Sequence, residues 1–479
     1  MPASAIGEQF RKTVVDRGTR VAVRMPANGS ATFADLADAA AAVSRALTAL
    51  RVARGAVVVS IVANGPMFFA LFAACMDEGV ALIPVGQATA MELTTLIEQA
   101  GAAAVITDRE LPIEGVREER VAAGVSIVRL RDPGDPPRHG ESVVLKLTSG
   151  STSAPRAAVA SEQHLINDGR HIVEAMGIAA ADVNAAYTPL SHSYAIGNVV
   201  IPLLCQGTGA AVYPSFNPLQ FVQDVLDSGA TVFPGVPFMF ERLKSAGIDR
   251  LPDCLRLLIT AGAAIDGAVV AWFRERLDRK VHSFYGSSET GGISYDDSEA
   301  AGDVVSVGTA LPETTIRMRD IRADGTGRVF VSGNAVSSGY AGVDNAAPIA
   351  EFADGGFLTA DLGRFDVDGR LVLAGRVSPV VNVAGRKVDP YEVERCLLAV
   401  PGIAASTVMG LDCDRRGQEL VAFVVRDDAR LTAVQIRTAC ATTLSPHKLP
   451  RRIVFLERLP VTDRGKIDRV ALRQLAGGA

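Results

Sequence analysis

Uncharged apolar runs alternate with amphipathic stretches along the first half of the chain. The longest uncharged run extends from Gly55 to Met76 and carries Asn64-Gly65-Pro66 in its middle. Because Asn-Gly and Gly-Pro pairs favour turns, this run predicts a buried strand over 56–62 and a buried helix over 67–76 rather than a membrane span. Apolar strands follow over 80–85 and 103–107, with a helical period between them. Strands that alternate with helices predict βαβ units and a largely parallel sheet.

The pattern changes twice in the second half of the chain. Strand–helix units continue from Ala210 to Gly286, and after Gly302 short strands with close turns predict a small β-barrel-like subdomain. Beyond Arg376, an acidic helix over 390–399, a strand pair and a basic tail predict a separate α+β domain. We therefore expect an α/β protein with a large N-terminal domain of stacked α/β sheets. The expected boundaries are 1–375 for the N-terminal nucleotide- and acid-binding domain, 376–379 for a hinge and 380–479 for a small mobile C-terminal lid.

Composition excludes several classes of protein. The 479 residues are 48% hydrophobic and 21% charged, which is typical of a globular chain with a large core. The net charge of −5, without a Lys/Arg block, makes nucleic acid an unexpected partner. The six cysteines are far apart, so their spacing predicts neither a disulfide framework nor a zinc site, and a reducing compartment is expected. Charged residues at 8, 11, 12 and 16 precede any apolar run, so we expect no signal peptide and a cytoplasmic protein.

Four polar segments carry candidate chemistry. In LTSGSTSAPRAAV (147–159), a strand runs into a Thr/Ser/Gly loop whose N–H groups and hydroxyls can surround phosphate oxygens, although this is not a Walker A loop. FYGSSETGGI (284–293) offers an aromatic ring for a flat base and Glu289 for a hard cation on a polyphosphate. In GFLTADLGR (356–364), Asp361 can accept two ribose hydroxyls, and Lys466 lies on a turn of the tail. Each segment alone is equally compatible with a solvated loop or hairpin.

The order of these segments is more specific than any one of them. The polar loop, PLSHSY, TAGAA, YGSSE, TADLGR, GRVSPVVNVAGRKVDPYEVE and PVTDRGKIDR together resemble the adenylate-forming superfamily. That superfamily groups acyl- and aryl-CoA ligases, peptide-synthetase adenylation domains and firefly luciferase. The resemblance covers nearly the whole chain, from Gly55 to Arg469. It implies ATP-dependent activation of an aryl or short- to medium-chain acid to an acyl-adenylate with release of pyrophosphate, then transfer to a thiol, with coenzyme A favoured.

The resemblance also implies a nucleotide site. Glu289 would bind Mg²⁺, and Lys466 would bridge carboxylate and phosphate during adenylation. The adenine would stack on Tyr285, the ribose would bind Asp361, and Arg376 would lie close by. The remaining residues implied at this site are Thr148, Ser149, Gly150, Ser151, Thr152 and Arg156 for the phosphates, with Gly262, Ala263, Gly286 and Ser288 around the base.

A second group of residues is implied for the acid and the thiol. The acid pocket would consist of His192, Ser193, Tyr194, Asn198, Val236, Gly286, Gly291 and Ile293. No carboxylate lies near His192 in the sequence to pair a substrate ammonium, so an amino acid is disfavoured. The lid would rotate about a hinge at Ser378 and present Gly385, Arg386 and Lys387 to the incoming thiol.

Departures from the family pattern leave alternatives open. Ser153 and Ala157 replace glycines of the phosphate loop, Ala360 replaces another glycine, and Pro379 stiffens the hinge. The first alternative is a stand-alone adenylation enzyme that loads an acyl, aryl or amino acid onto the phosphopantetheine of a carrier protein in trans. The second is a non-catalytic nucleotide-binding homologue, which the retained Glu289 and Lys466 disfavour. The acid, the acceptor and a homodimeric state stay open.

Overall fold

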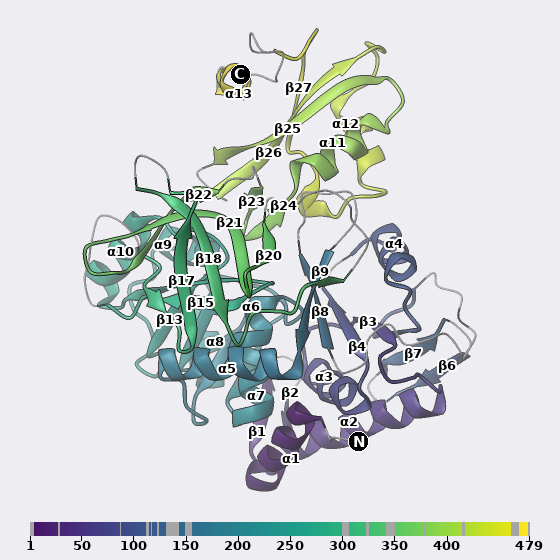
Figure 1. Ribbon diagram of the computed structural model, residues 1–479, viewed down its shortest axis with the longest axis vertical. Helices are drawn as coiled ribbons and strands as arrows, with labels where there is room; N and C mark the ends of the chain where they lie inside the picture. Colours follow the sequence, from purple (N-terminus) through teal and green to yellow (C-terminus); the bar gives the residue numbers. More distant parts are fainter. Residues whose placement is uncertain are drawn as a thin grey trace.

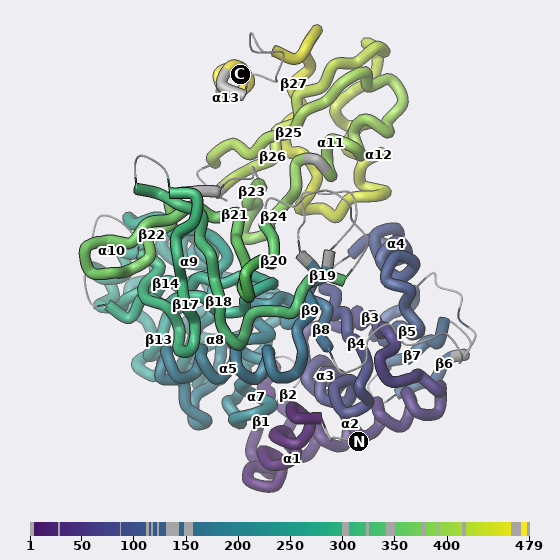
Figure 2. The backbone as a smooth tube through the Cα atoms, viewed as in Figure 1, coloured from purple at the N-terminus to yellow at the C-terminus, as the bar shows by residue number. Residues whose placement is uncertain are grey.

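The computed structural model describes residues 4–26, 29–86, 88–111, 115, 117–121, 124–130, 143–148, 156–298, 306–321, 325–341, 350–376, 380–413, 417–460 and 469–477. Two large sheets with their helices form the lower part of the view in Figure 1, and a smaller C-terminal unit lies above them. The tube in Figure 2 shows that the N-terminus and the C-terminus lie at opposite ends of the molecule. Within the described residues, no helix combines the length and the apolar composition that a membrane span requires.

The first sheet contains the βαβ units predicted from the apolar runs. Its order is β19-β9-β8-β4-β3-β5-β7-β6, and β3, β4, β5 and β8 are parallel. Its strands are β3 (Val57–Ile61), β4 (Ala81–Val85), β5 (Ala104–Thr107), β6 (Arg117–Arg120), β7 (Ser126–Arg129), β8 (Val143–Thr148), β9 (Arg156–Ser161) and β19 (Tyr340–Ala341). The helices α2 (Phe33–Ala49), α3 (Pro66–Glu78) and α4 (Ala90–Ala100) belong to this region. The predicted turn is confirmed, because α3 begins at Pro66 directly after Gly65.

The second sheet has nine strands in the order β16-β15-β14-β13-β12-β10-β11-β1-β2. The six strands from β14 to β1 are parallel along this order. The strands are β1 (Val21–Met25), β2 (Gly29–Thr32), β10 (Val183–Ala186), β11 (Gly209–Val212), β12 (Val232–Gly235), β13 (Leu257–Thr260), β14 (Val281–Ser287), β15 (Gly291–Tyr295) and β16 (Thr309–Ala310). The helices are α1 (Ala5–Arg17), α5 (Glu162–Met176), α6 (Ser193–Ala195), α7 (Ile201–Gln206), α8 (Phe221–Ser228), α9 (Pro237–Ser245) and α10 (Gly267–Leu277), with a π-helical turn at Ile196–Val200 between α6 and α7.

Two smaller sheets complete the described chain. The expected barrel-like subdomain takes the form of a five-stranded antiparallel sheet of β17 (Thr314–Arg319), β18 (Gly327–Gly333), β20 (Glu351–Ala353), β21 (Gly356–Phe365) and β22 (Leu371–Arg376). The C-terminal sheet contains β23 (Val381–Val383), β24 (Arg386–Val388), β25 (Ile403–Cys413), β26 (Gly417–Arg426) and β27 (Arg452–Phe455). Its helical elements are α11 (Pro390–Leu398), α12 (Ala433–Cys440), the 3₁₀ turn η3 (Pro446–Lys448) and α13 (Arg469–Gly477). This unit has its own apolar core, as expected of a separate α+β domain.

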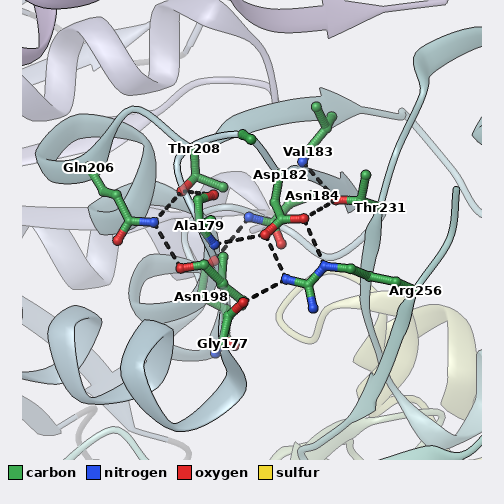
Figure 3. A network of polar contacts seen from close by, with 12 residues as sticks. Gly177, Ala179, Asp182, Val183, Asn184, Asn198, Gln206, Thr208, Thr231 and Arg256 are labelled. Carbon is green, nitrogen blue, oxygen red and sulfur yellow. Dashed lines mark hydrogen bonds and ion pairs between the residues drawn. The ribbon is translucent and has the colours of Figure 1, made fainter.

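A buried carboxylate joins the amino-terminal ends of three neighbouring parallel strands. Asp182, just before β10, accepts hydrogen bonds from Thr231 Oγ1 (2.7 Å), just before β12, and from Arg256 Nη2 (2.6 Å), just before β13. Arg256 Nη2 also donates to the carbonyl of Gly177 at 2.7 Å, and Figure 3 shows these contacts as one network. The network joins the amino-terminal ends of these strands. The loops at their carboxyl-terminal ends, which we call the carboxyl edge, are therefore available to form a site.

Asp182→Asn should destabilise the protein without altering the loops at the carboxyl edge. Removing one partner of a buried ion pair costs about 3–5 kcal/mol, and we expect about 2–3 kcal/mol because the Arg256 side chain is 42% exposed. Chemical unfolding followed by circular dichroism measures this loss, with the exposed Asp253→Asn as the matched control. The loss should also depend on pH. Burial opposes the charged carboxylate, but hydrogen bonds from Arg256, Ala179 and Thr231 hold the pKa of Asp182 below its usual value.

A lowered pKa in the folded state contributes stability above the ordinary carboxyl pKa and loses it as the pH falls through the folded-state value. The difference between wild type and Asp182→Asn should therefore be full at neutral pH and shrink below about pH 4. A difference that stays constant down to strongly acidic pH would contradict the assignment of this ion pair.

Candidate functional site

Loops from several strands meet beyond the carboxyl edge of the nine-stranded sheet. The segments after β10, β12, β13 and β14 carry His192, Val236, Gly262 and Ser288, respectively. Parallel strands bring their carboxyl ends to one edge, and open α/β sheets bind ligands there. Gly262 has a φ of +85°, and a Cβ at this position would lie 4.0 Å from Val236 Cγ1, so the loops after β12 and β13 lie close together.

The residues predicted for adenine and ribose lie in direct contact. Tyr285 on β14 is buried, and its hydroxyl donates to Asp361 Oδ2 on β21 at 2.7 Å. Asp361 is the register partner of Arg376 on the neighbouring strand β22. Three elements thus place the aromatic ring, the carboxylate and the arginine backbone together, although no local sequence pattern links them.

The predicted metal ligand lies on the turn between β14 and β15. Glu289 Oε1 accepts a hydrogen bond from Tyr340 Oη at 2.8 Å, and the Glu289 carbonyl accepts from the Ser337 amide at 2.8 Å. Because Tyr340 pairs with Ala158 on β9, the glutamate lies near the strand that follows the predicted phosphate loop. Among the described residues there is no group of three or more acidic, histidine or cysteine side chains that could hold a metal ion. A single carboxylate such as Glu289 would need further ligands, such as phosphate oxygens, to bind Mg²⁺.

Two buried charged residues beside Glu289 did not appear among the sequence predictions. Lys146 on β8 is 4% exposed and interacts electrostatically with Asp168 on α5 and with Glu289. Asp168 Oδ1 accepts from the Gly292 amide at 2.7 Å. Burial lowers the pKa of Lys146, and these two carboxylates oppose that change. A lysine inside the apolar strand VVLKLT was the available signal, but its partners are brought to it only by the tertiary fold.

Three of the predicted acid-pocket residues, Ser193, Tyr194 and Asn198, lie in the segment after β10. Ser193 Oγ donates to Ser288 Oγ at 2.9 Å, which joins the segment after β10 to the one after β14. Tyr194 stacks on Phe284 with ring centroids 5.8 Å apart, and its buried hydroxyl has no hydrogen-bond partner within the described part of the chain. Asn198 lies in the π-helical turn, where its side-chain amide donates to the Tyr194 carbonyl at 3.1 Å.

Glycines keep the neighbouring turn compact. Gly286 and Gly292 are register partners on β14 and β15, and a Cβ on Gly286 would lie 2.6 Å from the Gly291 carbonyl oxygen. Gly291 has a φ of +68°, a conformation that favours glycine. Ile293, the remaining predicted wall residue, is fully buried.

The hairpin predicted for the thiol lies at the junction of the C-terminal unit with the N-terminal sheets. Gly385, between β23 and β24, has a φ of +82°, and a Cβ there would lie 3.4 Å from Val236 Cγ2. Nη1 of the next residue, Arg386, lies 3.2 Å from Nδ1 of His447 on η3. His192 is exposed at the junction, where the nearby Arg386 charge disfavours its protonated form.

A glutamate on α4 joins the two units from the other side. Glu92 caps α4 together with Thr89, and the same carboxylate accepts from Ser445 Oγ and from Lys448 Nζ (3.1 Å). Lys448 also binds Glu392 on α11 at 2.8 Å. Burial opposes the charge, but hydrogen bonds from Ser445 and Thr89 and the charge of Lys448 hold the pKa of Glu92 below its usual value. The bridge joins positions 356 residues apart in sequence.

The predicted phosphate loop, hinge and C-terminal lysine lie wholly or partly outside the described residues. Thr148 and Arg156 are register partners at the ends of β8 and β9, so the predicted phosphate loop connects these two strands. Ser149, Gly150, Ser151 and Thr152 of that loop lie outside the described residues, as do Ser378 of the hinge and Lys466 of the tail. Ala263 follows Gly262 in the loop after β13, and Lys387 lies on β24.

Comparison with known proteins supplies the context for this geometry. Residues 10–341 match the model of the AMP-binding enzyme family, and residues 392–466 match the model of its C-terminal domain. A feruloyl-CoA synthase from Amycolatopsis sp is 27% identical over 463 residues, which cover 93% of this chain and 94% of that protein. A 2-succinylbenzoate–CoA ligase from Enterococcus faecalis is 30% identical over 338 residues, which cover 69% of each.

Solved structures share the fold and differ in how closely they match it. The o-succinylbenzoate CoA synthetase of Bacillus subtilis bound to a product analogue superposes with a TM-score of 0.85 at 21% identity, covering 99% of this chain and 98% of that one. The same enzyme in complex with an acyl-adenylate gives 0.67 at 21% identity, covering 98% of each chain. Both matches cover nearly the whole chain and therefore show the shared fold of both units.

Glu92→Gln should weaken this placement of the C-terminal unit. Glutamine keeps the capping box of α4 but removes the charge that Lys448 and Ser445 bind, and a hydrogen bond to a charged group is worth about 1.5–3 kcal/mol. We expect the population of the observed arrangement to fall about tenfold or more. Fluorescence energy transfer between dyes on the two units measures this shift, and Glu98→Gln, an exposed carboxylate of the same helix, is the control. Equal transfer efficiencies in wild type and Glu92→Gln would show that the bridge does not hold the units together.

Proposed function

The chain belongs to the AMP-binding enzyme family, and we propose that its carboxyl-edge site activates an aryl or short- to medium-chain carboxylic acid for transfer to coenzyme A. Its relatives are CoA ligases, and the chain is an AMP-forming acid–thiol ligase. The reaction has two steps: the acid carboxylate attacks the α-phosphate of ATP and releases pyrophosphate, and a thiol then displaces AMP from the acyl-adenylate.

One observation carries the assignment of the nucleotide site. The Tyr285–Asp361 hydrogen bond brings an aromatic ring and a carboxylate together, which supports a site for a base and a ribose bound side by side. A carboxylate can accept both ribose hydroxyls, and Gly262, in the loop after β13, has no side chain to keep a base from the backbone. The contact between Ser193 and Ser288 brings the predicted acid pocket to the same edge of the sheet.

Mg²⁺ would bind at Glu289 together with the nucleotide phosphates. When bound, the ion would neutralise charge on the phosphates as pyrophosphate leaves. The chain's own contribution is to hold the glutamate in place through Tyr340 and Ser337.

The acid pocket favours an uncharged, flat or apolar acyl group. Tyr194, which stacks on Phe284, is apolar over its ring, and Ser193 is an uncharged polar group. The feruloyl and succinylbenzoyl groups named for the two relatives are aromatic acids, which supports an aryl substrate. The phosphopantetheine of a carrier protein is the alternative acceptor, and amino acids remain disfavoured substrates.

Acid-dependent pyrophosphate release tests the proposal directly. The purified chain is supplied with ATP, Mg²⁺ and single acids from a panel of benzoates, cinnamates, short and medium fatty acids and amino acids, each with and without coenzyme A. We expect release with one aryl or acyl class and a further increase with coenzyme A. Release that is indifferent to coenzyme A would support a carrier protein as acceptor. No release with any acid would favour the non-catalytic homologue.

Lys466→Ala should separate the two half-reactions. If Lys466 neutralises charge between the carboxylate and the α-phosphate, its loss should slow adenylate formation about 10²–10³-fold. Thioester formation from preformed acyl-adenylate should stay close to the wild-type rate, because that step does not create the bond that the lysine assists. Rapid-quench measurement of each half-reaction gives both rates. An equal loss in both steps would contradict this role for Lys466.

A further inference from the structure

Lys146 is a buried cation to which the proposed reaction assigns no role. It is the only charged residue of strand β8, VVLKLT, and its side chain is almost fully removed from solvent. Asp168 on α5 and Glu289 on the turn after β14 both interact with it electrostatically. A buried charge is costly unless opposite charges compensate it, so the two carboxylates account for its presence. One of them is the predicted metal ligand.

The strand register places Lys146 and Tyr340 on either side of a small residue. Ala158 on β9 pairs with Lys146 on β8 and with Tyr340 on β19. Side chains at paired positions of neighbouring strands lie on the same face of a sheet, and the methyl group of Ala158 takes up little of the space between the other two. Tyr340 Oη donates to Glu289 Oε1 at 2.8 Å, so the Glu289 carboxylate lies on this face. Because neighbouring strands are about 5 Å apart, a lysine two strands from Tyr340 can reach the same carboxylate.

Asp168 holds the base of the turn between β14 and β15. Its Oδ1 accepts a hydrogen bond from the Gly292 amide at 2.7 Å. A Cβ on Gly291 would lie 2.5 Å from that oxygen, and a Cβ on Gly197 would lie 2.7 Å from Oδ2, so the carboxylate occupies space that these glycines leave free. Lys146 thus connects a fixed carboxylate to the predicted metal ligand that this turn presents.

We propose that Lys146 is a positioning residue, which together with Tyr340 holds the Glu289 carboxylate in place for the Mg²⁺ that a nucleotide brings. This inference rests on the proposed function and extends it to the residues that prepare the metal ligand. Lys146 does not itself contact the nucleotide in this role, and no bond forms or breaks at its amine. The competing explanation is a structural ion pair with Asp168, which would leave metal binding unaffected.

Binding of ATP with and without Mg²⁺ tests this role without any acid substrate. Calorimetry gives the dissociation constant of ATP in EDTA and in excess Mg²⁺, and the ratio of the two constants is the metal-dependent gain in affinity. Lys146→Met keeps the length of the side chain but removes the charge, and we expect it to reduce this gain about tenfold, as the loss of one charge-assisted contact predicts. Affinity for metal-free ATP should change much less, because the lysine acts through the metal ligand. Glu289→Gln, which weakens the ligand itself, should remove most of the gain.

A second variant removes the unpaired charge that the first one leaves behind. Lys146→Met leaves Asp168 buried without its cation, which costs stability. Lys146→Met combined with Asp168→Asn removes both charges, and the asparagine side-chain oxygen can still accept from the Gly292 amide. We expect its gain to be about tenfold below that of Asp168→Asn alone, with the folded state checked by circular dichroism. Lys12→Met, whose side chain is 69% exposed, is the matched surface control.

The outcomes separate the role of Lys146 from the proposed function. An unchanged gain in both Lys146 variants, with the gain lost in Glu289→Gln, would overturn the positioning role and leave the proposed function intact. Equal losses of affinity with and without Mg²⁺ would also overturn it, because a general defect does not act through the metal ligand. A gain that survives in Glu289→Gln would contradict the metal site of the proposed function, and the role of Lys146 would fall with it.

Discussion

The common carboxyl edge of six parallel strands is the constraint on which the rest of this structure depends. Parallel pairing aligns the strands so that each one delivers its following loop to the same side. Asp182 and Arg256 tie the opposite edge together, and the loops that carry His192, Gly262 and Ser288 can then differ in sequence without disturbing the sheet. The site is thus assembled from residues that are far apart in the chain but belong to one edge.

The charged residues of the described structure differ in whether they have a partner of opposite charge. The ion pairs of Asp182 and Glu92 are complete, with every charge matched by a partner, and they hold strands or units in place. Arg386 is different because the described residues around it are neutral or already paired. Lys448, which is paired with Glu92 and Glu392, belongs to the framework that joins the two units.

Local sequence patterns predicted the helices and strands better than they predicted the tertiary contacts between them. The turn at Pro66 and the strands around it follow from apolar runs and turn chemistry, and the structure confirms them. The pairing of Tyr285 with Asp361 followed from a family resemblance, since nothing in either segment alone indicates the other. Lys146 and Asp168 could not be predicted as partners, because they lie on different elements, β8 and α5, that only the tertiary fold brings together. The salt bridge between Glu92 and Lys448 could not be predicted from the sequence either, because the pattern of α4 already explains Glu92 as a helix cap.

Glu92 shows why one residue can serve both local folding and domain arrangement. Its carboxylate lies at the amino-terminal end of α4, where the helix dipole and the Thr89 amide already favour a negative charge. The charge is therefore stable on the N-terminal domain alone, and the C-terminal unit only has to bring Lys448 and Ser445 to an anion that is ready for them. Release of the unit returns Glu92 to its role as a cap and leaves no uncompensated charge behind. Glu92 and Lys448 each keep a second partner, Thr89 and Glu392, so the contact between the two units adds to pairings that already exist within each unit.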